Sequence, residues 1–167
     1  MASTESPHCD ERPPGTAISL LVIHNISLPP GEFGGPWIDD LFMGRLDPAA
    51  HPYFADIAAL KVSAHYLIRR DGSLLQYVPE EMRAWHAGAS TWKGRERCND
   101  FSIGVELEGS DDVPFAEPQY ETLANLTREL FARHGRIDIA GHSDIAPDRK
   151  TDPGPWFDWE RYRGQIT

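Results

Sequence analysis

The sequence predicts an α/β fold in one domain, with a central mixed β-sheet flanked by helices. Three observations support this prediction. Strand-like and helix-like segments alternate along the chain, 167 residues suit a single sizeable core, and neither an internal repeat nor a linker divides the sequence. We therefore expect one domain over residues 1–167, in which residues 1–16 form an amino-terminal extension that packs on the domain or trails from it.

The first half of the domain starts with a buried strand. Residues 17–25 form a β-branched and apolar run, which is typical of a strand covered on both faces. Residues 27–36 hold three prolines and three glycines, so they predict a loop. Short helices are expected over 37–43 and 52–60, and the second has proline at its first position.

A hairpin is the next expected element. Residues 62–69 and 74–78 read as strands, and they flank Asp71-Gly72, a strong turn signal. Residues 80–100 show little regular pattern.

The second half contains the clearest patterns. Residues 101–109 alternate, with Phe101, Ile103, Val105 and Leu107 on one face and polar residues or glycine on the other. The 3.6-residue period then predicts the longest helix. The expected elements are a helix over 118–134 that ends at Gly135, a strand over 137–140, a polar loop over 143–155 and a closing helix over 156–166.

Composition excludes several classes of partner. The chain has 16 basic and 26 acidic residues and a net charge of −10, which disfavours nucleic acid and anionic membranes. The first 19 residues lack a signal-like apolar stretch, and the longest aliphatic run, Leu20 to Ile23, is too short to span a bilayer. We expect a cytoplasmic monomer in which Cys9 and Cys98 are free thiols.

Histidines at predicted strand ends are candidate metal ligands. His24 and His142 both stand where a strand meets a loop, and the loop after His142 supplies Asp144, Asp148 and Asp152. Two histidines and one carboxylate form a catalytic zinc set that leaves a position open for water. A single histidine is more often a hydrogen-bonded structural residue, and spacing does not select among the three aspartates.

Two further patterns suggest catalytic groups. Three prolines stiffen the loop 145–155, and in an extended stretch Lys150 and Asp152 would point the same way. Lys150 could then stabilise an oxyanion, or the two could form an ordinary surface ion pair. Glu106 and Glu108 share a strand face, which is either its solvated side or the source of a general base. Periodicity does not choose between them.

Longer motifs carry a resemblance to a known family. The segments are VIHNISLPPGEFGGPWID, HPYFADIA, VSAHYLIRRDG, QYVP, RAWHAG, GRERCNDFSIGVELEG and GHSDIAPDRKTDPGP. Together they resemble the zinc-dependent N-acetylmuramoyl-L-alanine amidases, and most closely the AmpD type, which acts on anhydro-muropeptides in cytosolic peptidoglycan recycling. The likeness runs from about Ser6 to Trp159 and implies the same mixed sheet with packed helices.

The resemblance implies an assignment for each candidate. It makes His24, His142 and Asp152 the ligands of Zn²⁺, Glu106 the general base and acid, and Lys150 the group that stabilises the oxyanion. The reaction it implies is hydrolysis of the amide between anhydro-N-acetylmuramic acid and L-alanine. Related amidases carry Cys as the third metal ligand and Tyr in place of the glutamate. This chain has Asp152 and Glu106 at those positions, as the AmpD type does.

The resemblance also implies contacts with a small muropeptide. Lys61 and Arg97 match positions that contact the stem peptide, while Asn25 and Trp85 match positions that line the sugar and amide region. The loop Pro29 to Pro36 near His24 is a candidate mobile lid. A wall-lytic amidase and a non-catalytic muropeptide-binding protein remain alternatives, although all five catalytic and metal positions are filled.

Overall fold

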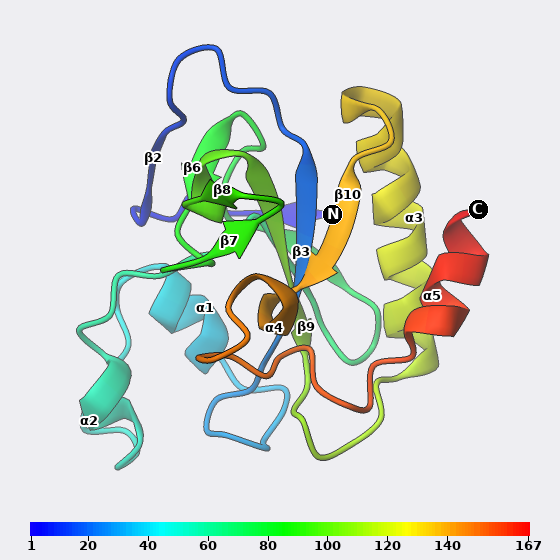
Figure 1. Cartoon of the computed structure of the whole chain (residues 1–167). Helices are drawn as coiled ribbons and strands as arrows, with labels where there is room; N and C mark the ends of the chain where they lie inside the picture. The colour runs from blue at the N-terminus through cyan, green and yellow to red at the C-terminus, as the bar shows by residue number, and fades with distance from the viewer.

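A six-stranded mixed sheet forms the centre of the molecule (Figure 1). The computed structural model describes residues 1–167. All neighbouring strands run parallel except one antiparallel pair, β4 and β5. In spatial order the strands are β1 (Ala2–Ser3), β5 (Leu74–Gln76), β4 (Tyr66–Ile68), β9 (Ser102–Glu108), β3 (Leu20–Ile26) and β10 (Asp138–Gly141). The predicted fold class, a single α/β domain with a mixed sheet, is confirmed.

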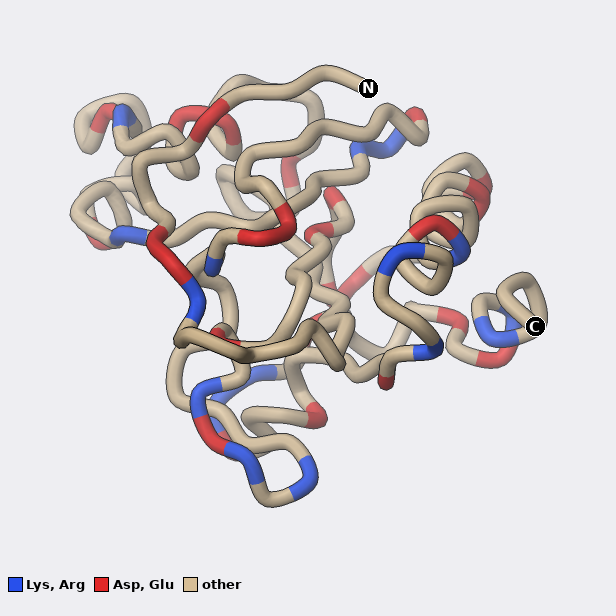
Figure 2. Tube along the Cα trace, turned by 90° about the horizontal axis from the view of Figure 1, so that it is seen from above, with Lys and Arg blue, Asp and Glu red and all other residues tan.

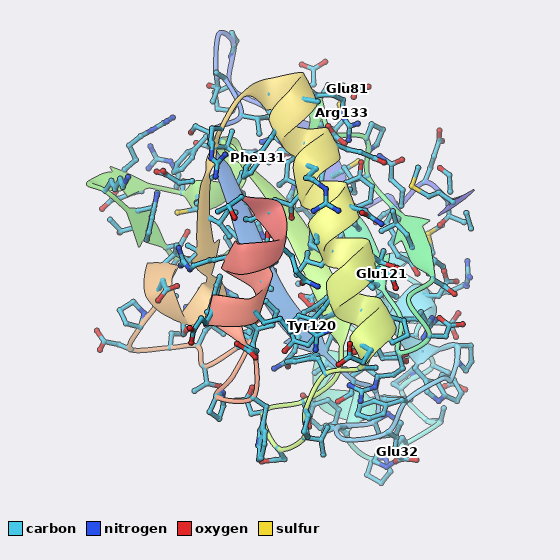
Figure 3. The ribbon with its side chains drawn as sticks, turned by 90° about the vertical axis from the view of Figure 1, so that its right-hand side faces the viewer. Glu32, Glu81, Tyr120, Glu121, Phe131 and Arg133 are labelled. Carbon is cyan, nitrogen blue, oxygen red and sulfur yellow. The ribbon has the colours of Figure 1, made fainter.

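Two helices cover one face of the sheet, as Figures 1 and 3 show from two sides. They are α3 (Glu117–His134) and α5 (Trp159–Ile166). Side chains alternate between the faces of a strand, so Leu21 and Ile23 of β3 point to these helices together with Ile103, Val105 and Leu107 of β9. This face holds the largest apolar cluster, and it contains no group of the candidate site.

The opposite face carries polar groups among smaller apolar clusters. Leu20 and Val22 of β3 pack there near α4 (His142–Ile145), and α1 (Trp37–Phe42) and α2 (Phe54–Ile57) lie further along. By the same alternation, the side chains of Ser102 and Glu106 point to this face. Helices therefore cover both faces of the sheet. Only the face to which Ser102 and Glu106 point carries groups of the candidate site.

The expected elements are present with shifted ends, and several short ones are additional. The Asp71-Gly72 turn joins β4 to β5 as predicted, and both cysteines are free. Of the two alternatives for the strand at 101–109, the solvated side is wrong, because Glu106 and Glu108 are only 8% and 2% exposed. The prediction of a loop over 143–155 is wrong at its start, because α4 covers His142–Ile145. The elements that the sequence does not predict also include β1, the short strands β2 (Cys9–Glu11), β6 (Met82–Ala84), β7 (Thr91–Trp92) and β8 (Arg95–Glu96), and the 3-10 turn η1 (Cys98–Asp100).

The amino-terminal extension is tied to the domain at two points. β1 pairs with β5, and β2 pairs with β6 in a separate two-stranded sheet. The Arg12 guanidinium then donates hydrogen bonds to four backbone carbonyls. Those carbonyls belong to Glu80, Asn99, Asp100 and Ser102. None of the helices in the molecule is long and apolar enough to cross a membrane.

Candidate active site

The carboxyl ends of three parallel strands gather the candidate residues. His24 of β3 is the register partner of Glu106 on β9, so both side chains lie on the same face of the sheet. β10 pairs with β3 through Gly141 and Ile23, and the next residue, His142, starts α4. Ends of parallel strands are where open α/β sheets present their functional groups, because loops can diverge there.

Three potential ligand atoms converge at this edge. The Nδ1 atoms of His24 and His142 are 3.0 Å apart, and Asp152 Oδ2 lies 3.1 Å and 3.3 Å from them. All three residues offer atoms within 4.8 Å of one another, as a metal centre requires. Asp144 is used otherwise, because its Oδ2 accepts a hydrogen bond from the Gly141 amide at 2.7 Å.

The chemistry of this donor set fits a divalent cation. Two ring nitrogens and a carboxylate oxygen that face one another repel when all three carry lone pairs, and a shared cation removes that repulsion. Two nitrogen ligands and one oxygen ligand leave one position of a tetrahedral ion open. Burial lowers the pKa of His24, while hydrogen bonds and the charge of Asp152 act in the opposite direction. A neutral imidazole is the form that binds metal.

Glu106 is a buried carboxyl with one unsatisfied oxygen. Its Oε1 lies 3.5 Å from His24 Nδ1, whereas Oε2 is buried and has no hydrogen-bond partner. Burial and, next, the negative charge of Asp152 raise the pKa of Glu106 well above its usual value, and Lys150 acts in the opposite direction. An unpaired buried carboxyl costs stability, so its retention points to chemistry.

A cleft of about 740 Å³ opens over this cluster. It is lined by all five predicted metal and catalytic residues and by three of the four predicted substrate-binding residues, namely Asn25, Lys61 and Trp85. Arg97 is not brought to the cleft: its side chain is 77% exposed and lines a separate hollow beside Ala146 and Asp148. Arg149 lines both spaces, so the hollow adjoins the cleft.

The loop that carries Lys150 and Asp152 is folded into turns. The amide of Lys150 donates to the carbonyl of Ala146 at 2.9 Å, so the expected extended stretch is wrong. Both side chains nevertheless line the cleft. Asp111 ties the loop to β3, because it accepts hydrogen bonds from Thr151 Oγ1 at 2.5 Å and from Asn25 Nδ2 at 2.7 Å.

The candidate lid has a defined anchor. The Gly34 amide donates to Glu108 Oε2 at 2.8 Å, and the Arg69 guanidinium donates to the same oxygen at 3.0 Å. Glu108 Oε1 accepts from the backbone amide of Arg70 at 3.1 Å. Glu108 is therefore satisfied by the loop and its neighbours. Whether Pro29 to Pro36 moves as a lid stays a prediction.

Some supporting residues escaped the sequence reasoning. Asp111 lies in a loop without periodicity, and only its three-dimensional contacts with Asn25 and Thr151 single it out. Trp85 is held from behind by Asp10, which accepts from its indole Nε1 at 3.1 Å, and by His8, whose ring stacks against it. The amino-terminal extension thus supports one wall of the cleft.

The cleft carries charged side chains of both signs. Acidic and basic residues alternate along the chain without long tracts of one sign (Figure 2). Three cations, Lys61, Arg149 and Lys150, line the cleft together with four carboxyl groups, those of Glu106, Asp111, Asp112 and Asp152. A ligand with negative groups would therefore have to meet these individual cations, since the lining is not positive overall.

The chain is similar in sequence and in fold to known amidases. AmpD of Escherichia coli (strain K12), a 1,6-anhydro-N-acetylmuramyl-L-alanine amidase, is 64% identical over 164 residues, which are 97% of this chain and 90% of the relative. A crystal structure of a selenomethionine AmpD derivative matches with a TM-score of 0.97 at 61% identity, covering 99% of this chain and 94% of that one.

A second solved relative carries a substrate. The amidase AmiD from E. coli, in complex with anhydro-N-acetylmuramic acid-L-Ala-D-γ-Glu-L-Lys, matches with a TM-score of 0.66 at 32% identity, covering 93% of this chain and 60% of that one. The family model described as N-acetylmuramoyl-L-alanine amidase matches residues 14–155, most of the chain. The sheet, the convergence of the candidate ligand residues and these likenesses lead to one conclusion: the chain belongs to the N-acetylmuramoyl-L-alanine amidase family.

Proposed function

We propose that this protein is a zinc hydrolase of cytoplasmic peptidoglycan recycling. It cleaves the amide between anhydro-N-acetylmuramic acid and L-alanine in small muropeptides. One observation carries the proposal: His24, His142 and Asp152 converge beside the unpartnered carboxyl of Glu106 at the base of one cleft. The AmpD relatives, whose names state this activity, support the choice of substrate.

Zinc is the ion that this donor set suits best. His24 and His142 would each contribute Nδ1, and Asp152 a carboxylate oxygen. The ion supplies Lewis-acid chemistry, because it makes water more acidic and polarises a carbonyl group.

Glu106 would move the proton in both halves of the reaction. Its carboxylate, whose Oε1 lies 3.5 Å from His24 Nδ1, would accept a proton from the attacking water and later deliver that proton to the nitrogen of the leaving L-alanine. Burial keeps bulk water from competing for this carboxylate. Lys150 lines the same cleft, and its ammonium would stabilise the negative charge that develops on the carbonyl oxygen during attack.

The remaining lining residues would bind the substrate. Lys61 would meet a carboxylate of the stem peptide, while Asn25 and Trp85 would line the sugar and amide region. Arg97 would take part only where a stem peptide passes Arg149 into the adjoining hollow. The protein would act as a monomer on this small ligand.

Turnover on two substrates tests the proposal. The purified chain, loaded with zinc, is given a 1,6-anhydro-muropeptide or intact sacculi, and release of the L-alanine-headed peptide is measured by chromatography. We expect efficient release from the fragment only, loss of release with a chelator, and recovery with added zinc. Preference for sacculi would instead establish a wall-lytic amidase. Binding of the fragment without release would establish a muropeptide-binding protein, and full release in the presence of chelator would overturn the metal assignment.

A further inference from the structure

The segment His86–Ala87 contacts the Nε2 atom of both candidate histidine ligands, His24 and His142. His86 Nδ1 lies 2.8 Å from His24 Nε2, and the two rings meet edge to face. One residue later, the carbonyl oxygen of Ala87 lies 3.0 Å from His142 Nε2. These two nitrogens point away from the ligand cluster, where the Nδ1 atoms meet Asp152.

These contacts define which ring nitrogen carries the proton. A carbonyl oxygen can only accept, so His142 must donate from Nε2, which leaves the lone pair on Nδ1. For His24 to offer Nδ1 in the same way, its Nε2 must donate to His86 Nδ1. His86 then carries its own proton on Nε2, which lies 3.0 Å from the hydroxyl of Ser102. In this series of hydrogen bonds each residue donates to the next, His24 to His86 and His86 to the hydroxyl oxygen of Ser102.

Further contacts hold the segment in place. Asn99 Oδ1 accepts hydrogen bonds from the backbone amides of both His86 and Ala87, at 3.1 Å and 2.8 Å. The His86 ring lies flat against Gly104 of β9, where a Cβ atom would come within 2.5 Å of its Cγ. Any side chain at Gly104 would displace the ring, so the strand that carries Glu106 also fixes His86.

We propose that His86 and Asn99 are positioning residues that set the tautomer and orientation of both histidine ligands. The inference rests on the proposed metal role of His24 and His142. Hydrogen-bond partners on the far side of a ligating imidazole orient the ring and raise its basicity, and their loss typically weakens metal binding about 10- to 100-fold. Here one dipeptide serves both rings, and one amide side chain holds that dipeptide.

Paired variants of His86 test this proposal. His86→Leu fills the space without an acceptor, whereas His86→Gln keeps one oxygen acceptor for His24 and one amide donor for Ser102. Zinc affinity is measured by competition with a chelator, and the visible spectrum of the Co²⁺ form reports ligand geometry. We expect His86→Leu to bind zinc about 10- to 100-fold more weakly with an altered Co²⁺ spectrum, and His86→Gln to recover most of the affinity.

Asn99 provides an independent pair should His86→Leu fail to fold. Asn99→Ala removes the acceptor for both amides, and Asn99→Asp retains an oxygen there, so the first should weaken zinc binding and the second restore it. His134→Gln is the matched control, because the His134 ring bonds Glu80 and no part of the segment His86–Ala87. It should change stability and leave zinc affinity within about twofold.

Two outcomes would overturn the proposal. One is unchanged zinc affinity in both His86→Leu and Asn99→Ala. The other is a raised KM with unchanged zinc affinity, which would make His86, a residue that also lines the cleft, a substrate contact. Long-range ¹H–¹⁵N spectra of the metal-free protein separate this test from the proposed function. The Nε2-protonated signals of His24 and His142 should be present in the wild type and altered in the variants, even if zinc proves not to be the ion.

Discussion

Two buried glutamates on one strand have opposite hydrogen-bonding environments. Glu106 and Glu108 stand two residues apart on β9. Glu108 accepts hydrogen bonds from Gly34, Arg69 and Arg70, so both its oxygens are satisfied. Glu106 keeps Oε2 without any partner. A carboxylate that is fully bonded stabilises the fold, and one left unpaired is free to exchange a proton.

The difference arises from what each side chain meets near the carboxyl end of the strand. Glu108 is at the last position of β9, where the loop that contains Gly34 returns and Arg69 follows β4. Glu106 is one step earlier on the same face, where the neighbouring strand supplies His24 and no donor reaches Oε2. Position along the strand therefore decides which glutamate anchors a loop and which serves the cleft.

The largest expected effect is the loss of turnover in Glu106→Gln. The amide cannot take a proton from water, so kcat should fall about 10²- to 10⁴-fold. Because Oε2 makes no hydrogen bond, the substitution breaks none, and stability to urea should not fall. Zinc should remain bound. Turnover within twofold of the wild type would remove Glu106 from the proton-transfer role.

Glu108→Gln should show the reverse pattern. The change leaves the Arg69 guanidinium without its charged partner and places an amide donor against a backbone amide. Arg69 is largely buried, so we expect a loss of about 3 kcal/mol in the free energy of unfolding, measured in urea at pH 7. Turnover of the folded fraction should change only a few-fold. A catalytic loss as deep as that of Glu106→Gln would abolish the distinction between the two residues.

Much of the fold could be predicted because it follows from local pattern. The 3.6-residue period and Gly135 place the long helix within one residue of its observed start and end at His134. Asp71-Gly72 gives the hairpin. The strands β2 and β6 could not be found in this way, because three-residue edge strands carry no period. β2 belongs to the amino-terminal extension, and its pairing with β6 is supported by hydrogen bonds of Arg12 to residues far along the chain, such as Ser102.

The candidate site was less accessible to local pattern. His24 and His142 stood out as strand ends, yet only the family resemblance separated Asp152 from Asp144 and Glu106 from Glu108. The contact between His24 and His86 joins residues that are 62 positions apart, and their spacing in the sequence does not predict it. Sequence gives the residue types, and the parallel strand register decides which of them meet.

A third glutamate, the half-buried Glu80, makes the comparison measurable by pH. Burial raises its pKa, but hydrogen bonds from Arg133, Tyr66 and His134 outweigh burial and lower the pKa to about 2. Because the folded value lies below the unfolded one, the stabilisation is complete above about pH 4.5 and is lost as the pH falls towards 2. The pKa of Glu106 is raised by burial, so the ionised form of Glu106 does not stabilise the fold in this way.

Glu80→Gln should therefore lower stability by about 1 kcal/mol at pH 7, and the difference from the wild type should shrink between pH 4.5 and pH 2. The measurement is urea unfolding of both proteins across that range. Glu121→Gln, an exposed position on α3 that Figure 3 labels, is the control and should change stability little at any pH. A difference between Glu80→Gln and the wild type that persists unchanged at pH 2 would mean that shape, and not charge, is what Glu80 contributes. The negative charge of Glu80 would then not be what separates it from Glu106.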